Sequence, residues 1–345
     1  MADGALGYRL LGGSGLRVSQ LCLGTMTFGE GREWGTDPDT ATMILEQFAD
    51  AGGTFIDTAP NYSGGMAEEI VGRFVAGQRD RFVIGTKFTA SPDPHVSSTG
   101  NGRKAMRASV EASLRRLGTD HIDLFWLHFW DGTAPLDEIM RGLDDLVSQG
   151  KILHVGLSDT PAWLVSRAAT LAELRAQAPV TAVQIEYNLA ARSAERELLP
   201  MAEALDLGVL CWGPLAAGAL AGGADPKRRT AAQVPASLAD ASAALASLAQ
   251  KSGVSPAALA LRWLFYHPRW PGLIPIVGAR RTEHLVAALA AWSAGALPSD
   301  FAQAIETLAP PPPGFPHDLI GSSYLRKMAL GGEPGRIAAP IRSRA

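Results

Sequence analysis

Residues 54–87 read TFIDTAPNYSGGMAEEIVGRFVAGQRDRFVIGTK, and this stretch decides the fold. An apolar run from Thr54 to Asp57 predicts a strand, and the apolar spacing from Ala67 to Val75 predicts a helix. A second apolar run, Phe82 to Thr86, predicts the next strand. Strand, helix and strand in this order are typical of two parallel strands joined by a helical crossover. The stretch therefore predicts an α/β fold.

The same unit repeats along the chain, and eight copies can be counted. The predicted strands are Gln20–Leu23, Thr54–Asp57, Phe82–Thr86, Leu124–Leu127, Ile152–Leu157, Ala182–Glu186, Val209–Trp212 and Leu273–Val277. The predicted helices run from Pro38 to Gly52, Ala67 to Val75, Arg103 to Leu117, Pro135 to Gly150, onward from Pro161, Glu195 to Leu205, Ser255 to Phe265 and Thr282 to Trp292. Asp37-Pro38 and Thr160-Pro161 each offer an N-cap followed by a first-turn proline.

Alternation of strands and helices fits both a doubly wound sheet and a closed barrel. No predicted strand is followed by a G-x-G-x-x-G turn that opens a helix, as a nucleotide-binding sheet would require; the glycine clusters at 12–15 and 218–223 have other spacings. Eight consecutive units favour the (β/α)8 TIM barrel, in one domain over residues 1–345.

Three segments lie outside the repeat. A short hairpin is predicted from Tyr8 to Val18, before the first strand. A long connection, Leu215–Gly253, follows the seventh strand and contains an Ala-rich helix near Asp240–Lys251, and a tail follows Pro310. The long connection and the tail are either lids over a functional site or tolerated surface insertions.

Composition narrows the possible partners. A net charge of −3 provides no basic field for nucleic acid or anionic membranes, and no uncharged run reaches the ~18 residues of a membrane helix. The segment Met1–Tyr8 lacks the features of an export signal. Cys22 and Cys211 both lie in apolar runs, which favours two buried thiols over a disulfide. These observations predict a cytoplasmic globular protein that binds neither nucleic acid nor membrane.

Four polar side chains follow three adjacent predicted strands. Asp57 ends the second strand, Tyr62 lies five residues further on, Lys87 comes directly after the third strand, and His128 directly after the fourth. In such barrels the chemistry sits at the carboxyl ends of the strands, and neighbouring strands are only ~4.8 Å apart. Each residue alone has a plainer reading as a cap, a surface charge or a core side chain. Their joint placement indicates one catalytic site.

The four side chains together could form a tuned proton donor. A nearby ammonium such as Lys87 stabilises a phenolate, so it is expected to lower the pKa of Tyr62. Asp57 would keep the lysine charged, and His128 could share a hydrogen bond with the phenol or with a substrate oxygen. Such a donor suits reduction of a carbonyl, in which a hydride reaches carbon and Tyr62 protonates oxygen. The residues by themselves leave the reaction open.

At these residues the sequence resembles the aldo-keto reductase family, whose members are (β/α)8-barrel oxidoreductases with a nicotinamide cofactor, usually NADPH. The likeness spans nearly the whole chain. It is carried by Leu21–Met26, Phe55–Ala59, Tyr62 with Gly65, Glu68, Glu69 and Gly72, Gly85–Lys87, Ile122–Leu124 with Leu127-His128, Gly150–Ile152 and Gly156–Ser158. The resemblance implies that Tyr62 is the general acid, assisted by Lys87, Asp57 and His128.

The resemblance also implies a cofactor site. Ser158 and Gln184 match residues that hold the nicotinamide carboxamide, and Asp159 stands where the family mostly has asparagine. Trp212 matches an aromatic ring that stacks on the nicotinamide, although a packing tryptophan would fit the same position. The other matched cofactor positions are Gly24, Thr25, Met26, Asp57, Pro214, Leu215, Gly218, Ile276, Gly278 and His284.

The adenosine end of the cofactor is expected at Pro275–Leu285. Arg280 or Arg281 could pair bidentately with a 2′-phosphate, which favours NADPH over NADH, although a solvated helix start would also explain two arginines. His284 replaces a commoner glutamine or arginine, and Ala288 a usual asparagine, so the adenine contacts are expected to differ from the family's.

The substrate is expected to be a small lipophilic or aromatic aldehyde or ketone, and a keto-sugar or a natural-product intermediate stays open. Beside Tyr62 and His128, the aromatic residues Phe28, Phe88, Phe129 and Trp130 are predicted near the mouth of the barrel, with the long connection and residues 315–324 of the tail as lids. No metal is expected. Two other classes stay open: a nicotinamide-binding regulatory or interaction subunit with little turnover, and a metal-dependent hydrolase. The seven histidines show no H-x-x-x-H spacing, which argues against the hydrolase.

Overall fold

The computed structural model describes residues 5–30, 33–222, 236–308, 310, 314–320 and 322–329. The chain divides into two compact units, Met1–Ala309 and Pro310–Ala345. The second unit holds two short helices, α11 (His317–Ile320) and α12 (Ser323–Ala329). The predicted tail belongs to this unit, and the barrel lies in the first.

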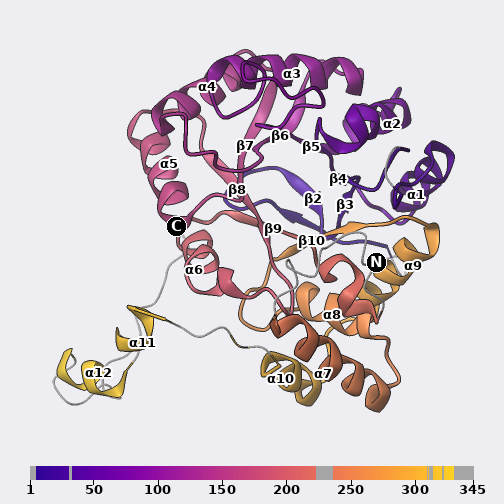
Figure 1. Cartoon of the computed structure of the whole chain (residues 1–345), viewed down its shortest axis with the longest axis vertical. Helices are drawn as coiled ribbons and strands as arrows, with labels where there is room; N and C mark the ends of the chain where they lie inside the picture. The colour runs from indigo at the N-terminus through magenta and orange to yellow at the C-terminus, as the bar shows by residue number, and fades with distance from the viewer. Residues whose placement is uncertain are drawn as a thin grey trace. The chain divides into compact units, whose positions relative to one another are not determined.

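Eight parallel strands of the first unit close into a barrel in the order β10-β3-β4-β5-β6-β7-β8-β9 (Figure 1). They are β3 (Cys22–Gly24), β4 (Phe55–Asp57), β5 (Val83–Phe88), β6 (Ile122–Leu127), β7 (Ile152–Ser158), β8 (Val180–Glu186), β9 (Gly208–Trp212) and β10 (Ile274–Gly278). Each predicted strand corresponds to one of these, and no end is shifted by more than two residues. The predicted (β/α)8 barrel is confirmed.

Helices surround the barrel in the expected alternation (Figure 1). They are α1 (Pro38–Asp50), α2 (Met66–Val75), α3 (Arg103–Leu117), α4 (Leu136–Ser148), α5 (Ala162–Leu174), α6 (Leu198–Ala204), α8 (Pro256–Phe265) and α9 (Thr282–Ser293), with α7 (Ala236–Ser252) and α10 (Ser299–Glu306) in addition. Asp37 caps α1 by accepting from the Thr40 amide, and Ser255 caps α8 by accepting from the Ala258 amide. Within the described ranges, no helix has the length and apolarity needed to cross a membrane.

Two predicted segments differ from the structure or lie partly outside it. The helix predicted over Glu195–Leu205 begins at Leu198 and follows a short 3-10 turn, Ser193–Glu195. Pro200 explains the shorter helix, because proline is tolerated only in the first turn. In the long connection, residues 223–235 lie outside the described residues, so its role as a lid stays a prediction. The Ala-rich helix predicted there lies within α7.

The interior of the barrel is filled by side chains. Trp126 of β6 is fully buried, and its indole occupies the space beside Gly85 of β5 and Gly156 of β7. A Cβ at Gly85 would lie 2.9 Å from the indole nitrogen, and one at Gly156 would overlap the ring. The two glycines therefore make room for the tryptophan. A barrel that is packed in this way can hold a site only at its ends.

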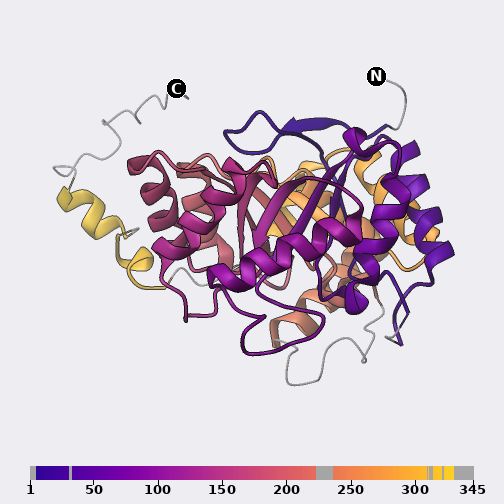
Figure 2. The same ribbon diagram turned by 90° about the horizontal axis from the view of Figure 1, so that it is seen from above.

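A hairpin closes the amino end of the barrel. Strands β1 (Tyr8–Leu10) and β2 (Arg17–Ser19) pair antiparallel, as predicted, and Leu11 and Val18 pack into the inner cluster of the barrel. Figure 2 shows this hairpin along one end of the barrel, with long loops at the opposite end. Gly12, at φ +55°, lets the turn approach the backbone of Asp206 and Gly208. The carboxyl end of the barrel is left for the site.

Candidate active site

A buried ion pair lies at the carboxyl ends of β4 and β5. The Lys87 ammonium donates to Asp57 Oδ2 at 2.5 Å, and both side chains are almost completely buried. Gln184 Nε2 donates to the other carboxylate oxygen, Oδ1, at 2.9 Å. The Thr25 amide and hydroxyl both donate to the Asp57 carbonyl, at 3.0 and 3.1 Å. Asp57 is therefore held from three sides, and it fixes the lysine.

Tyr62 lies next to this pair. Lys87 Nζ donates to the Tyr62 hydroxyl oxygen at 3.3 Å and to the Thr58 carbonyl at 2.8 Å. The three N–H groups of the ammonium thus have three acceptors: a carboxylate, a carbonyl and the phenol. No acceptor for the Tyr62 hydroxyl proton occurs in the part of the chain that the structure describes. The phenol oxygen is oriented by Lys87, and its proton is available to a bound molecule.

The loop that carries Tyr62 depends on glycine. Tyr62 begins a 3-10 turn, η1 (Tyr62–Gly65), in which Gly64 and Gly65 have φ of +67° and +99°. A side chain at Gly65 would meet the Arg116 side chain, which bonds the fully buried Glu68 at 2.6 Å. Thr86 also donates to Glu68, at 2.6 Å. The Arg116–Glu68 pair thus anchors the turn that carries Tyr62. The sequence patterns did not predict this pair; the only signal was a carboxylate, Glu68, on the apolar face of a predicted helix.

Electrostatics keep Tyr62 protonated. Burial raises the pKa of Tyr62 above its usual range, and this effect outweighs the opposing influence of the Lys87 charge. The expectation that Lys87 would lower the pKa of Tyr62 overall is therefore wrong, because it omitted the cost of burying a phenolate. Burial alone would lower the pKa of Lys87, but Asp57 and Tyr62 more than compensate, so the pKa of Lys87 is raised. The pair consists of a neutral phenol and an ammonium ion.

His128 faces Tyr62 from the end of β6. The two rings meet edge to face, with centroids 6.3 Å apart, and His128 Nδ1 is buried without a hydrogen-bond partner among the described residues. Burial, together with the positive charge of Lys87, lowers the pKa of His128 to about 3. The imidazole is thus neutral at physiological pH, and one of its nitrogens is available to a bound polar group.

The low pKa of His128 predicts a pH effect on stability. An unfolded histidine titrates near pH ~6.5, whereas His128 in the fold titrates at about 3. Between these values the unfolded chain binds one more proton, so the contribution of His128 to stability is present above the higher value and declines as the pH falls. We therefore expect the free energy of unfolding, measured with urea, to fall less between about pH 7 and about pH 5 for His128→Gln than for the parent protein. Equal losses for both proteins would contradict the neutral, buried imidazole.

A second group of side chains joins the ends of β7, β8 and β9. Ser158 pairs in register with Gln184, and Trp212 Nε1 donates to Asp159 Oδ1 at 3.0 Å. The Ser158 hydroxyl is buried and has no hydrogen-bond partner among the described residues. Asp159 thus orients the partly exposed Trp212, which is a role that the sequence prediction missed. Gln184, predicted to hold a carboxamide, also anchors Asp57.

The predicted cofactor positions in the other strands fall into two kinds. Gly24, Thr25 and Ile276 are buried, and a Cβ on Gly24 would lie 2.7 Å from the Ile276 side chain. Met26 and Gly278 are exposed, and Gly278 pairs in register with Gly24. Gly24, Thr25 and Ile276 thus belong to the packed end of the barrel. Met26 and Gly278 lie on its surface.

The predicted phosphate-binding residues meet at the amino end of α9. The Arg280 amide donates to His284 Nδ1 at 3.4 Å, and the Arg281 guanidinium lies 3.2 Å from His284 Nε2. Burial and the charges of the two arginines lower the pKa of His284, so this imidazole stays neutral. His284 therefore organises the arginine segment.

The segment after β9 is a tight turn. Pro214 is buried and Leu215 is partly buried, and η4 (Ala216–Ala221) follows them. Gly218 in this turn has φ +97°. The turn follows Trp212 directly, so the chain places these predicted cofactor positions beside the indole.

The predicted aromatic wall is only partly present. Phe28 and Phe88 are fully buried in the main hydrophobic core, where Phe88 stacks on Phe125. Their assignment to the substrate pocket stays a prediction. Phe129 is 41% exposed and its ring lies 5.5 Å from that of His128, while Trp130 is partly buried. The Phe129 ring thus lies next to His128.

A buried amide ties the loop after β5 to the loop after β6, which carries His128 and Phe129. Asn101 Nδ2 donates to Thr89 Oγ1 at 2.8 Å and to the Phe129 carbonyl at 3.2 Å, and Asn101 Oδ1 accepts from the Asp131 amide. The sequence prediction also missed this residue, because an asparagine before a helix looks like an ordinary loop residue.

The fold and the site define a (β/α)8-barrel enzyme with a buried Asp-Lys-Tyr group at the carboxyl ends of its strands. The model of the Aldo/keto reductase family matches residues 20–310. The chain belongs to the aldo/keto reductase family, and the predicted class, an oxidoreductase, is confirmed.

Curated relatives cover most of the chain. An aryl-alcohol dehydrogenase [NADP(+)] of Phanerodontia chrysosporium is 36% identical, over 91% of this chain and 88% of the relative. A norsolorinic acid reductase of Aspergillus flavus is 38% identical, over 81% and 76%. Norsolorinic acid reductase B of Dothistroma septosporum is 34% identical, over 93% and 86%.

Proposed function

We propose that this protein reduces an aldehyde or ketone to an alcohol with NADPH, and that Tyr62 is the general acid. The contact chain Asp57–Lys87–Tyr62 carries the proposal. It holds a protonated phenol whose oxygen is oriented by an ammonium and whose proton is available to a bound molecule. A carbonyl oxygen gains negative charge during reduction, so a positioned proton donor beside it lowers the barrier.

Each residue of the group has a separate task. Tyr62 gives its proton to the substrate oxygen, and Lys87, 3.3 Å away, stabilises the phenolate that remains. Asp57 keeps the lysine charged despite its burial. His128 is neutral, so it can form a hydrogen bond with the substrate oxygen without adding a charge. Reprotonation of Tyr62 completes the cycle.

The residues at the strand ends fit a nicotinamide cofactor. The buried Ser158 hydroxyl without a partner suits the carboxamide, and the oriented indole of Trp212 suits the ring. When bound, NADPH supplies the hydride. The name of the Phanerodontia chrysosporium relative supports NADP as the cofactor. Gln184 would also hold the carboxamide, and Gly218 and the Arg280–His284 segment would hold the rest of the molecule.

The two arginines provide a test of cofactor choice. We expect Arg280→Ala/Arg281→Ala to weaken NADPH binding by about tenfold or more, since a charge-assisted hydrogen bond contributes roughly 1.5–3 kcal/mol. NADH lacks the 2′-phosphate, so its affinity should change little. Arg167→Ala/Arg175→Ala on the α5 side removes the same charge elsewhere and serves as the control. Equal weakening of NADPH and NADH would refute the phosphate role.

The substrate class follows from the site and from the relatives. Phe129 lies beside His128, and Trp130 follows it in the chain, so both offer aromatic surface there. The name of the aryl-alcohol dehydrogenase relative also points to an aromatic compound. We infer an aromatic aldehyde or ketone.

The two cysteines bear on the location of the protein. Cys22 and Cys211 are buried and not bonded to each other, which supports a cytoplasmic location.

A substrate panel tests the proposed reaction. Mixing the protein with NADPH and a panel of aromatic and aliphatic carbonyls should show the fastest NADPH oxidation with aromatic ones. Tight NADPH binding without turnover on any carbonyl would refute the function.

A further inference from the structure

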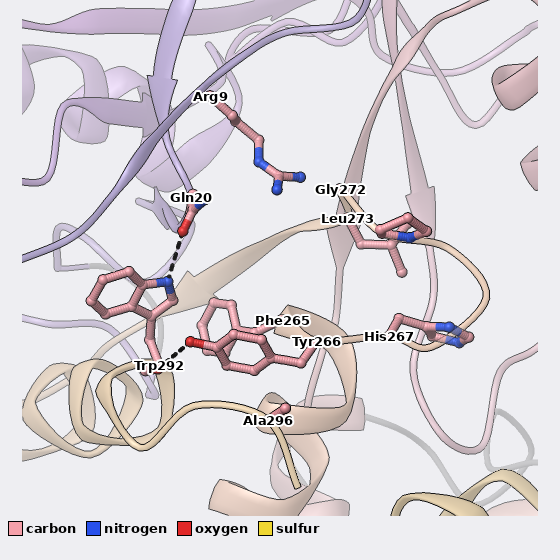
Figure 3. A pocket seen from close by; sticks show the side chains of 10 residues that line it. Arg9, Gln20, Phe265, Tyr266, His267, Gly272, Leu273, Trp292 and Ala296 are labelled. Carbon is pink, nitrogen blue, oxygen red and sulfur yellow. Dashed lines mark hydrogen bonds between the residues drawn. The ribbon is translucent and has the colours of Figure 1, made fainter. Parts of the chain in front are cut away.

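A pocket of about 360 Å³ lies at the amino end of the barrel, away from the catalytic group (Figure 3). It is lined by Arg9, Gln20, Phe265, Tyr266, His267, Pro271, Gly272, Leu273, Trp292 and Ala296. Arg9 belongs to β1 of the hairpin, Gln20 and Leu273 precede barrel strands, and Trp292 and Ala296 come from the end of α9 and the residues after it. Tyr62, Lys87 and His128 lie at the opposite strand ends. We propose that this pocket binds a small aromatic carboxylate, with Arg9 as the anion-binding residue.

Arg9 is a cation without a counterion in the described part of the chain. Its guanidinium forms none of the ion pairs found there, and its partly buried side chain leaves Nε without a hydrogen-bond partner. Burial lowers the pKa of Arg9. The ten lining residues include no carboxylate. A guanidinium that is partly removed from water loses some of its solvation, so a bound anion would complete the site.

The backbone is shaped around this guanidinium. Gly272 has φ +113°, and a Cβ at that position would lie 2.9 Å from Arg9 Nη1. Glycine therefore serves both the conformation of the loop before β10 and the space that Arg9 occupies. Figure 3 shows the guanidinium beside Gly272, across the pocket from the aromatic rings.

The opposite wall is a fixed aromatic surface. Trp292 Nε1 donates to Gln20 Oε1 at 3.1 Å, and the Tyr266 hydroxyl donates to the Trp292 carbonyl at 2.6 Å (Figure 3). Phe265 lies beside them. Because Gln20 accepts through its oxygen, its amide nitrogen remains as a second donor at the edge of this wall. The pocket combines the Arg9 guanidinium at one side with aromatic rings at the other.

These features select the ligand class. A single planar guanidinium matches a single carboxylate in a bidentate pair, and one cation neutralises one negative charge. The aromatic wall favours a flat apolar body attached to that carboxylate. Inorganic phosphate offers no surface for the rings. An aromatic monocarboxylate satisfies both sides of the pocket.

Calorimetric titration of the full-length protein with 2-naphthoate tests the site. We expect saturable binding to one site, at least about tenfold weaker to Arg9→Met, which is the loss expected for a charge-assisted hydrogen bond. Arg17→Met is the matched control, since Arg17 is exposed on β2 of the same hairpin and pairs in register with Leu10. It should bind like the parent. Arg9→Lys, which keeps the charge and loses the planar fork, should fall between the parent and Arg9→Met.

Two further probes decide the ligand class. The neutral isostere 2-naphthamide should bind at least about tenfold more weakly than 2-naphthoate, and inorganic phosphate should not compete with it. Equal affinity of the parent and folded Arg9→Met for 2-naphthoate would overturn the site, because the ligand would then be bound elsewhere, the catalytic end included. Competition by phosphate at the same affinity would overturn the aromatic assignment. Unchanged thermal unfolding of Arg9→Met shows that a lost signal is not lost folding.

Discussion

Tyr62→Phe is expected to lower the rate of carbonyl reduction by about 10²- to 10⁴-fold, which is the usual contribution of a positioned general acid. The substitution removes only the hydroxyl that Lys87 orients. The affinity for NADPH should remain within about twofold of the parent, because no step of cofactor binding needs the proton. Single-turnover kinetics and a direct NADPH titration separate the two quantities.

Tyr8→Phe is the control for this experiment. Tyr8 lies in β1 at the other end of the barrel, where it is exposed and its hydroxyl donates to the Gly52 carbonyl. Its loss should leave the rate unchanged. If Tyr62→Phe retains the parent rate, another group donates the proton and the assignment of the acid is wrong.

Lys87→Met is expected to lower both activity and stability. It leaves the Asp57 carboxylate buried without its cation, and breaking one partner of a buried pair costs about 3–5 kcal/mol of the free energy of unfolding. It also removes the charge that stabilises the Tyr62 phenolate, so the rate should fall by about a hundredfold or more. Urea unfolding and steady-state kinetics measure the two effects.

Asp57→Asn/Lys87→Met separates charge burial from chemistry. Removing both charges should restore much of the lost stability, while the rate stays low because Tyr62 still lacks an ammonium. Full stability of Lys87→Met alone would mean that solvent reaches the pair and that its burial is unimportant. If the double variant recovers the parent rate, Lys87 has no role in the reaction.

The barrel was predictable because its signals are local. Asp37 caps α1 as predicted, and apolar runs identify the strands. The predicted cap Thr160 does not cap α5, because its hydroxyl donates to the Ser158 carbonyl instead. The predicted range of helix α6 was too long, because apolar spacing alone neglects the effect of Pro200. Local patterns predict where elements lie, and single residues within them adjust their ends.

The part of the site that could be predicted consists of residues at or just after the ends of adjacent strands. Asp57, Tyr62 and Lys87 meet because adjacent strands end at the same rim. Burial is a tertiary property, so the sequence did not predict that Phe28 and Phe88 are fully buried, and it misjudged the direction in which the pKa of Tyr62 shifts. The role of Asn101 could not be predicted for the same reason. Its hydrogen bonds join two loops that are far apart in the sequence.

Transfer of deuterium from NADPH labelled at the nicotinamide C4 tests the central claim most directly. The protein is incubated with the labelled cofactor and an aromatic aldehyde, and the alcohol is analysed by mass spectrometry. The proposed reaction predicts one deuterium on the carbinol carbon for each NADPH consumed, with the hydroxyl proton coming from Tyr62 and thus from solvent. An alcohol without deuterium, or bound NADPH that is never consumed, would contradict the assignment of this barrel as a carbonyl reductase.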